Sequence, residues 1–251
     1  MKRPVVRHEN TIAARAIVVI AGLLGSTLLY GCGNTSSDNR ALASEDVLRN
    51  TLVGLEEMGG GWEGLWDPTM NGDSPAVTDP EIEAALDRLS VCAGRNAPVF
   101  LTDLEPTVTG STLLGPADEF GLQVQIDSHV YASRGVAADL GELVKHQDCL
   151  SAYTADRITA SLDQPSLTVS PAVPSIITQG LPKGLVGIRF DLTISNASTS
   201  VPVSSTLLAG GEGSFAVFYD ISTVGGPAPQ LLVDRLAGLM TNKVAEVADA
   251  L

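Results

Sequence analysis

The sequence predicts an α+β protein: an antiparallel sheet of about five or six strands with helices packed on one side, preceded by a lipoprotein signal peptide. Three observations predict this class. Residues 167–222 are rich in β-branched residues and are divided by Gly- and Ser-rich turns. Apolar residues recur at helical spacing before and after this block. An uncharged apolar run near the start of the chain ends at Gly31-Cys32.

The first 31 residues are arranged as an export signal. Residues 1–16 carry four basic residues and one acid, and residues 17–30 carry no charge. Leu29 and Gly31 precede Cys32 at the spacing that lipoprotein processing requires. An uncleaved transmembrane helix is the alternative, but it needs about 20 apolar residues, and the run from Ala16 to Tyr30 is shorter. We therefore expect Cys32 to be the lipid-attachment residue.

This assignment divides the chain into three parts. Residues 1–31 are the signal peptide, and residues 32–43 are the lipidated cysteine and a flexible tether of small polar residues. Residues 44–251 contain no internal repeat or second linker, so we expect a single domain. Stable anchoring takes more than one acyl chain. A diacylated or triacylated Cys32 would hold this domain at the outer face of the cell membrane.

The charge of the chain excludes one class of partner. The formal net charge is −14, and the first 31 residues contribute +3, which leaves −17 after processing. So acidic a domain is repelled by nucleic acid and by anionic lipid surfaces. Solubility explains this acidity most simply. Calcium binding is the alternative, but the sequence contains no D-x-[DN]-x-[DN]-G loop, and we expect no cofactor.

Cys92 and Cys149 remain once Cys32 carries the lipid. In an oxidising compartment an even pair is expected to form a disulfide. A reactive thiol is the alternative, although no C-x-x-C motif is present. A zinc site needs three or four ligands of the right type. Two histidines beyond the signal and two paired cysteines do not supply them, so we expect no metal site.

Each helix and strand has its own signal. Ser44 as an N-cap and the apolar spacing that follows predict a helix over 45–57, ended by Gly59-Gly60-Gly61. Asp79-Pro80 begins a second helix that runs into Cys92 and stops at Gly94. Strand-like pieces lie within 97–114 and over 122–131. A third helix begins at Gly135, with Cys149 just past its last turn. The predicted strands of the second half are 167–173, 184–195, 201–210 and 214–222, and a final helix from about residue 232 packs on them.

Four pieces of the chain occur in a characteristic order. They are a helix followed by Gly60-Gly61-Trp62, an early Cys92-Ala93-Gly94, a strand–helix unit ending in Cys149, and a strand meander with a C-terminal helix. This layout resembles the actinobacterial extracytoplasmic sensor-like lipoproteins, relatives of the PknH-type extracellular sensor domain. The resemblance implies helices packed on a curved antiparallel sheet and a role in ligand binding or sensing. PknH-type domains typically carry two disulfides, whereas this chain has cysteines for one.

No catalytic constellation is evident, and we expect no enzymatic activity. Asp127, Ser128 and His129 are neighbours, but adjacent residues on a strand point to opposite faces, and no G-x-S-x-G motif occurs. His129 is expected at the surface of a strand and His146 at a helix end, where the helix dipole favours a cation. A serine hydrolase therefore remains only a minor alternative.

Trp62 and Trp66 are the candidate ligand-binding residues. Two indoles close together in a chain that is 4% aromatic either cap the core or line an apolar pocket or partner surface. The sequence thus predicts a membrane-anchored, non-catalytic module that binds an apolar envelope ligand between its sheet and helices. An accessory lipoprotein that binds another envelope protein is the alternative.

Overall fold

The computed structural model describes residues 44–66, 80–94, 97–98, 101, 107–108, 112–115, 123–160, 162 and 166–251. The predicted signal peptide, Cys32 and the tether lie outside the described residues. In chain order the elements are α2 (Glu45–Arg49), α3 (Leu55–Met58), β1 (Glu63–Trp66), α5 (Pro80–Ala93), β2 (Thr112–Leu114), β3 (Gln123–Ala132), the 3-10 helix η1 (Val136–Gly141), α7 (Glu142–Lys145), α8 (Gln147–Ala160), β4 (Thr168–Val169), β5 (Val173–Ile176), β6 (Val186–Ser195), β7 (Ser200–Glu212), β8 (Phe215–Val224) and α9 (Gln230–Asp249).

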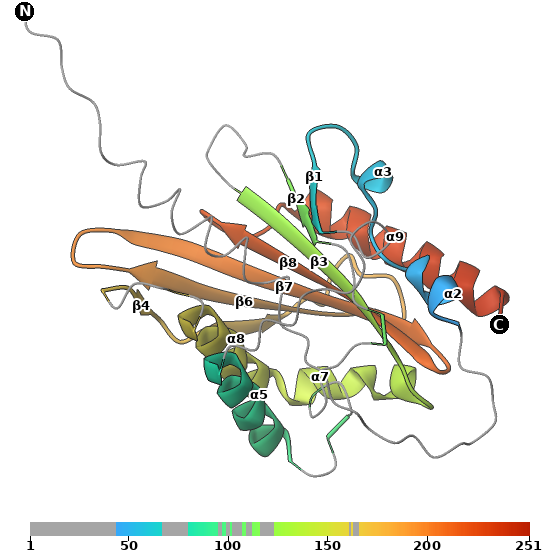
Figure 1. Ribbon diagram of the computed structural model, residues 1–251, viewed down its shortest axis with the longest axis horizontal. Coiled ribbons are helices and arrows are strands. Elements are labelled where there is room, and N and C mark those ends of the chain that lie inside the picture. Colours follow the sequence, from blue (N-terminus) through green and yellow to red (C-terminus); the bar gives the residue numbers. More distant parts are fainter. Residues whose placement is uncertain are drawn as a thin grey trace, which may run out of the picture.

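One antiparallel sheet forms the centre of the described chain (Figure 1). Its eight strands follow the order β1-β2-β3-β8-β7-β6-β4, with β5 also pairing with β6. The strands β6, β7 and β8 form the predicted meander, and each pairs with the next over ten residue positions. The α+β class with an antiparallel sheet is confirmed. The sheet has more strands than predicted because β1 and β2 extend it beyond β3 and because the segment 167–176 forms two short strands.

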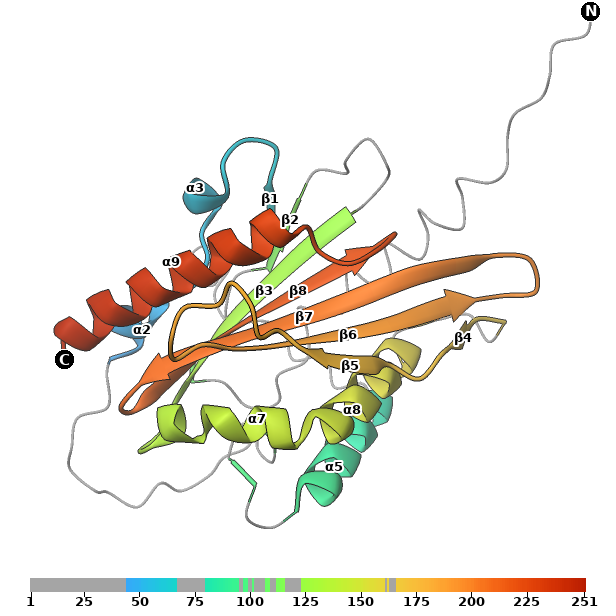
Figure 2. The same ribbon diagram turned by 180° about the vertical axis from the view of Figure 1, so that it is seen from behind.

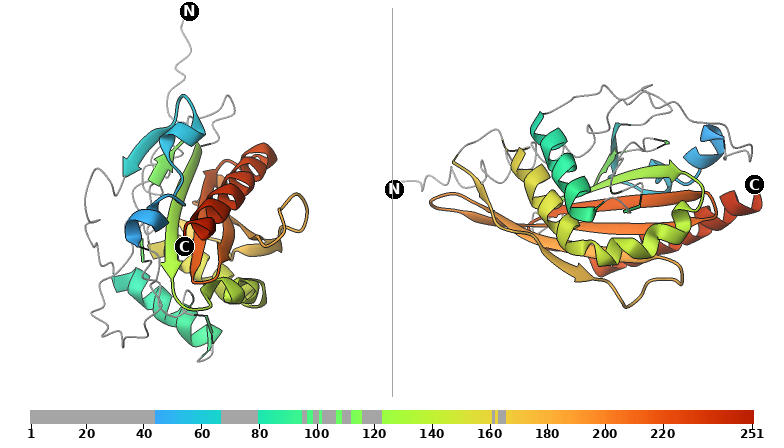
Figure 3. Two further views of the ribbon diagram at one scale, coloured as in Figure 1. Left: turned by 90° about the vertical axis from the view of Figure 1, so that its right-hand side faces the viewer. Right: turned by 90° about the horizontal axis from the view of Figure 1, so that it is seen from below.

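The helices lie on both faces of the sheet, not on the single side that the sequence predicts (Figures 2 and 3). On one face, here the α9 face, Leu236 and Met240 of α9 and Leu48 of α2 pack on Val217 and Tyr219 of β8. On the other, the α8 face, helices α5, α7 and α8 and the 3-10 helix η1 cover a second apolar cluster. Every residue of β8 is buried. Both faces of such a strand need a covering layer, which explains the difference.

Helix α9 packs closely on its strands. A Cβ atom built on Gly210 of β7 would lie 2.3 Å from Leu185 Cδ2 and 3.0 Å from Met240 Sδ. Only a residue without a side chain therefore fits at this position beneath the helix. The six buried residues of α9 recur at helical spacing, as the sequence predicts: Val233, Leu236, Ala237, Met240, Val244 and Val247.

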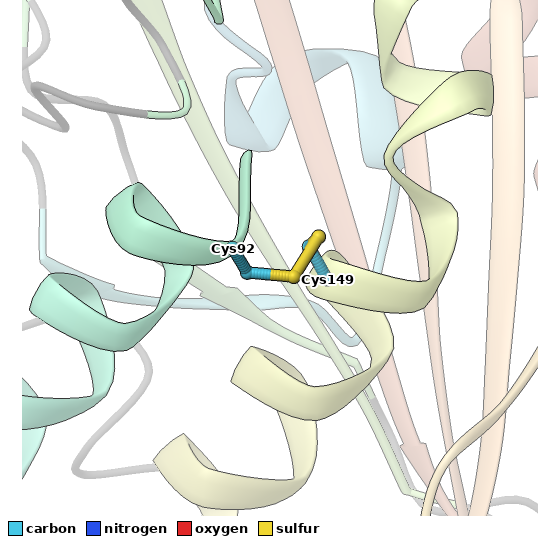
Figure 4. The surroundings of a disulfide bond; sticks show 2 residues. All are labelled: Cys92 and Cys149. Carbon is cyan, nitrogen blue, oxygen red and sulfur yellow. A yellow bond between two sulfur atoms is a disulfide. The ribbon is translucent and has the colours of Figure 1, made fainter. Parts of the chain in front are cut away.

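The disulfide between Cys92 and Cys149 is present (Figure 4). Its Cα–Cα distance is 5.7 Å, and it joins the last turn of α5 to the first turn of α8. Arg88 Nε and Asp156 Oδ2, 2.7 Å apart, link the same two helices further along. The predicted pairing is therefore confirmed. The expected position of Cys149 past the end of a helix is wrong, because the chain bends at His146 and starts a new helix, α8.

Of the two helices predicted in the first part of the chain, one differs from prediction and one agrees with it. The helix predicted over 45–57 is divided into α2 and α3, because Thr51 Oγ1 donates to the carbonyl of Leu48 and Gly54 adopts an extended conformation. Helix α5 runs from Pro80 to Ala93, and Gly94 follows at φ 86°, as predicted. Among the described residues, no helix combines the length and the apolar character that crossing a membrane requires.

Candidate functional site

Trp62 lies beside the core of the α9 face. It is half-buried and packs against that apolar cluster. A Cβ atom on Gly115 would lie 2.9 Å from the Trp62 ring, so the indole covers this glycine directly. This placement suits the core-capping role that the sequence left open. Trp66 is the last residue of β1, and the position of its side chain lies outside the described part of the structure.

A pocket lies at the far end of the α9 face, where α9 does not cover the sheet. It has a volume of about 330 Å³, within the range of ligand sites. We call it the β6–β7 pocket. Its walls come from the β4–β5 segment, the ends of β6 and β7 and the loop after β8; they include Ser170, Pro171, Val173, Asp191, Thr193, Pro202, Ser204 and Pro227.

The strand register places the polar side chains of this pocket on its floor. Asp191 pairs across strands with Ser204 of β7 and with Val173 of β5, and Thr193 pairs with Pro202. Directly paired residues share a face, so these side chains lie together on the α9 face. Asp191 Oδ2 accepts a hydrogen bond from Arg189 Nε at 2.9 Å. The Ser204 hydroxyl is buried and has no hydrogen-bond partner among the described residues.

The opposite face holds a buried polar cluster. Arg157 of α8 donates to Asp220 Oδ2 at 3.0 Å, and the two side chains are only 14% and 12% exposed. Asp127 is the cross-strand partner of Asp220. The Asp127–Asp220 cluster comprises these three residues and the neighbours that donate to the two carboxylates, Thr112, Gln125 and Ser205.

Burial and charge shift the proton affinities of this cluster. Burial raises the pKa of Asp127 to about 6; hydrogen bonds from Thr112 and Gln125 oppose this rise, and the Asp220 carboxylate adds to it. Burial alone would lower the pKa of Arg157, but Asp220 raises it above its usual value. Burial also raises the pKa of Tyr153, whose ring lies beneath the Arg157 guanidinium at 5.7 Å. Two carboxylates thus share one cation, which pairs directly with Asp220.

His129 is not at the surface, as the sequence analysis expected. It is half-buried on the α8 face and stacks on Phe218 with a ring-centroid distance of 5.4 Å. Burial lowers the pKa of His129 to about 4, so the imidazole is neutral at pH 7. His146 is the C-cap of α7, at the helix end that was predicted for it.

Ser128 and His129 do not meet. Ser128 Oγ accepts a hydrogen bond from the Val53 amide on the α9 face, whereas His129 lies on the α8 face. Among the residues that the structure describes, no group of three or more His, Cys, Asp or Glu side chains is arranged to hold a metal ion. The consecutive residues Asp127, Ser128 and His129 are thus divided between the two faces of the sheet, with Ser128 on the α9 face and the other two on the α8 face.

Sequence reasoning missed both the pocket and the cluster. One signal for the cluster was available: Gln125, Asp127 and His129 alternate with Val124, Ile126 and Val130 along β3. This pattern is typical of a strand with one solvated face. Here the polar face is covered by α8, and Arg157 lies 63 residues from Asp220 in the sequence. No local spacing could have connected those two residues.

No protein-family model matches this sequence, and no curated protein sequence is similar to it. Among solved structures, the chain is similar to LpqN, described as involved in cell envelope biogenesis of Mycobacterium tuberculosis. The TM-score is 0.28 with 10% sequence identity, over 52% of this chain and 68% of that chain. A likeness of this size carries no argument about fold or function. The relation to the PknH-type domain stays a prediction.

Proposed function

We propose that this chain is a lipid-anchored, extracytoplasmic module of the cell envelope that binds a ligand in the β6–β7 pocket without transforming it. The single observation that carries the proposal is the pocket itself. It is an open depression with a volume of about 330 Å³, and it brings a carboxylate and several hydroxyls together with proline and valine side chains. A few placed polar groups within an apolar rim are the usual composition of a small-molecule site.

The elements around the pocket suit binding. Asp191, Thr193 and Ser204 project from long paired strands, and strands hold side chains more rigidly than loops do. The sheet provides the floor, and the loop after β8 provides one wall. This position differs from the one expected near Trp62 and Trp66, because the indole of Trp62 is used to cover Gly115 and the core.

Two observations favour binding without catalysis. Asp127, whose pKa is raised by burial, lies on the other face of the sheet from the pocket. His129, whose pKa is lowered, also lies on that other face and is separated from Ser128 by the sheet. A general acid–base pair must reach the same bound molecule. The pocket and these titrating groups are on opposite sides.

The test uses the full-length protein in phosphatidylcholine nanodiscs, incubated with envelope extracts, washed, and examined by native mass spectrometry and thermal melting. Val173 lines the pocket and is 63% exposed, so Val173→Trp should fill the pocket without disturbing the core. Val91 on α5 is 82% exposed and far from the pocket, and Val91→Trp is the matched control. We expect a retained small molecule and a raised Tm for the native chain and Val91→Trp, but not for Val173→Trp.

Retention of the same molecule by Val173→Trp would refute the pocket as the site. Absence of any retained molecule from the native chain would refute the binding function. Stoichiometric cross-linking to an envelope protein that is unaffected by Val173→Trp would instead support the accessory role.

A further inference from the structure

We propose that the β6–β7 pocket takes a neutral, hydroxyl-rich molecule of the size of one or two sugar rings, drawn from the aqueous side of the envelope. This inference rests on the proposed binding function and names the chemistry of the ligand. It differs from the apolar ligand that the sequence predicts. The argument has three parts: the hydrogen-bonding groups of the floor, the charge of the lining, and the position of the pocket on the domain.

The floor offers hydrogen-bonding groups that match hydroxyls. A carboxylate accepts several hydrogen bonds, and Arg189 uses only Oδ2 of Asp191. Asp191 therefore keeps acceptor capacity for a ligand hydroxyl. Thr193 adds a hydroxyl that can donate and accept. The Ser170 hydroxyl already donates to the Pro171 carbonyl and accepts from the Thr193 amide, so it offers a ligand only its second acceptor lone pair. The Ser204 hydroxyl, directly across from Asp191, is buried and has no hydrogen-bond partner among the described residues, so a small side-chain rotation would let it bond to a ligand.

The charge of the lining disfavours ions. Among the described residues that line the pocket, Asp191 alone is charged, so this lining offers no cationic group to hold an anion. A cationic ligand would have to share Asp191 with the Arg189 guanidinium, which already pairs with it at 2.9 Å. A neutral molecule with several hydroxyl donors avoids both costs.

The rim and the volume limit the shape of the ligand. Pro171, Pro202, Pro227 and Val173 present aliphatic surface around the polar floor, which suits the C–H face of a saturated ring. A volume of about 330 Å³ is at the lower end of the range for ligand sites. An extended acyl chain would need a longer, drier channel.

Helix α2, at the start of the described chain, lies beside the C-terminal half of α9 (Figure 2). The first described residues contact the C-terminal half of α9, where Lys243 donates to the carbonyl of Asn50. The pocket-lining residue Pro227 precedes the first residue of α9, Gln230, in the chain by three positions. A helix of 20 residues is about 30 Å long. The pocket therefore opens about one helix length away from the point where the predicted tether joins the described domain.

The experiment titrates the full-length protein in phosphatidylcholine nanodiscs with four sets of probes, followed by calorimetry and saturation-transfer NMR. The neutral set is glucose, galactose, mannose, arabinose, trehalose and myo-inositol. The other sets are amines (choline, spermidine), anions (phosphate, citrate) and oleate. The pocket variants Asp191→Asn and Thr193→Val remove one charge and one hydroxyl. Their matched controls are Asp249→Asn at the end of α9 and Thr159→Val on α8, both of which are exposed.

We expect at least one neutral probe to bind with saturable heat. Thr193→Val should weaken it about 3-fold and Asp191→Asn about 10-fold, the loss typical of one neutral and one charge-assisted hydrogen bond. The two controls should bind as the native chain does. Binding of an amine, an anion or oleate that Val173→Trp abolishes would overturn the ligand class but keep the pocket. Binding of no probe overturns the ligand class; only an empty pocket in the extract experiment overturns the binding function as well.

Discussion

The helices on the two faces of the sheet are held in place by different interactions. Under α9, the contacts are mainly apolar, with isolated buried polar contacts such as Val53 to Ser128 and Tyr219 to Thr51, and the uncovered end of that face holds the β6–β7 pocket. Under α8, the helices are fixed by a disulfide, by the Arg88–Asp156 pair and by the Asp127–Asp220 cluster. One face is therefore a dry layer with an open end. The other is a closed layer that contains buried charge.

This difference has an energetic consequence. Apolar packing is non-directional and tolerates volume-conserving changes, so the α9 face depends on total buried area. A buried ion pair depends on each partner, because the loss of one leaves an uncompensated charge. We therefore expect the loss of one partner of an ion pair on the α8 face to lower the free energy of unfolding sharply. On the α9 face, we expect substitutions to lower it in proportion to the buried area that they remove.

The largest effect is expected from the disulfide. Replacing both cysteines, Cys92→Ser with Cys149→Ser, opens a loop with a sequence separation of 57 residues and should cost about 4 kcal/mol on the chain-entropy model. For a chain of this size the Tm should fall by about 8–16 °C. Thermal melting of the native chain with and without reductant provides the comparison. A melting curve that neither the substitution nor the reductant changes would show that α5 and α8 are held by other contacts.

The ion pair should have the next largest effect. Arg157→Gln leaves Asp220 buried without its cation and should cost about 3 kcal/mol in chemical denaturation. The matched double variant, Arg157→Gln with Asp220→Asn, removes both charges and should recover part of that loss. If the single and double variants are equally destabilised, the cost comes from lost packing of the long Arg157 side chain and not from unpaired charge.

The pH dependence of stability tests the buried carboxyl. The pKa of Asp127 rises from 3.8 to about 6 on folding, so the folded state binds the proton more tightly. The resulting stabilisation is fully present below pH 3.8 and is lost as the pH rises through about 6. Relative to Asp127→Asn, the native chain should lose about 2–3 kcal/mol between pH 4 and pH 7.

His129 works in the opposite direction. Its pKa falls from 6.5 to about 4 on folding, so its contribution is present above pH 6.5 and is lost as the pH falls through about 4. The variant His129→Phe removes this dependence, and Asp249→Asn controls for a solvated carboxylate. Should the native chain and Asp127→Asn give parallel profiles of unfolding free energy against pH, the raised pKa of Asp127 would be wrong.

The extent to which the sequence predicts this fold varies with the range of the interactions. Helix α9 and strands β6–β8 are predicted well because their periodicity and turn residues are local. The helix over 45–57 is predicted as continuous, but Gly54 interrupts it. The prediction that the helices lie on one side of the sheet is wrong. Every residue of β8 is buried in the structure, but the sequence of the strand does not by itself show which elements cover each side.

The candidate site could be predicted less well. Trp62 and Trp66 stand out in the sequence because they are rare, yet the indole of Trp62 covers Gly115. The pocket is made by residues that are ordinary individually, and only the pairing of Asp191 with Ser204 and Val173 brings them together. The charge of a residue and its spacing from its neighbours can be read from the sequence. The register between distant strands is a tertiary property.

The smallest expected effect lies on the α9 face. The buried Tyr219 hydroxyl donates to the Thr51 carbonyl at 2.6 Å. Tyr219→Phe keeps the ring and leaves that carbonyl without its donor, which should cost about 1–2 kcal/mol. The loss should appear first as faster hydrogen exchange of the Val53 amide, which donates to Ser128 and so reports detachment of the segment before α3.

Thr51→Val is the matched control, because it removes the hydroxyl bonded to Leu48 but keeps the carbonyl that Tyr219 contacts. Faster exchange at Val53 in Tyr219→Phe, and less so in Thr51→Val, would show that one hydrogen bond pins this segment to a largely apolar face. Equal exchange in the native chain and Tyr219→Phe would instead mean that apolar packing of Leu48 and Met58 suffices to hold it. In that case the α9 face would depend on buried area even where it contains a buried polar contact.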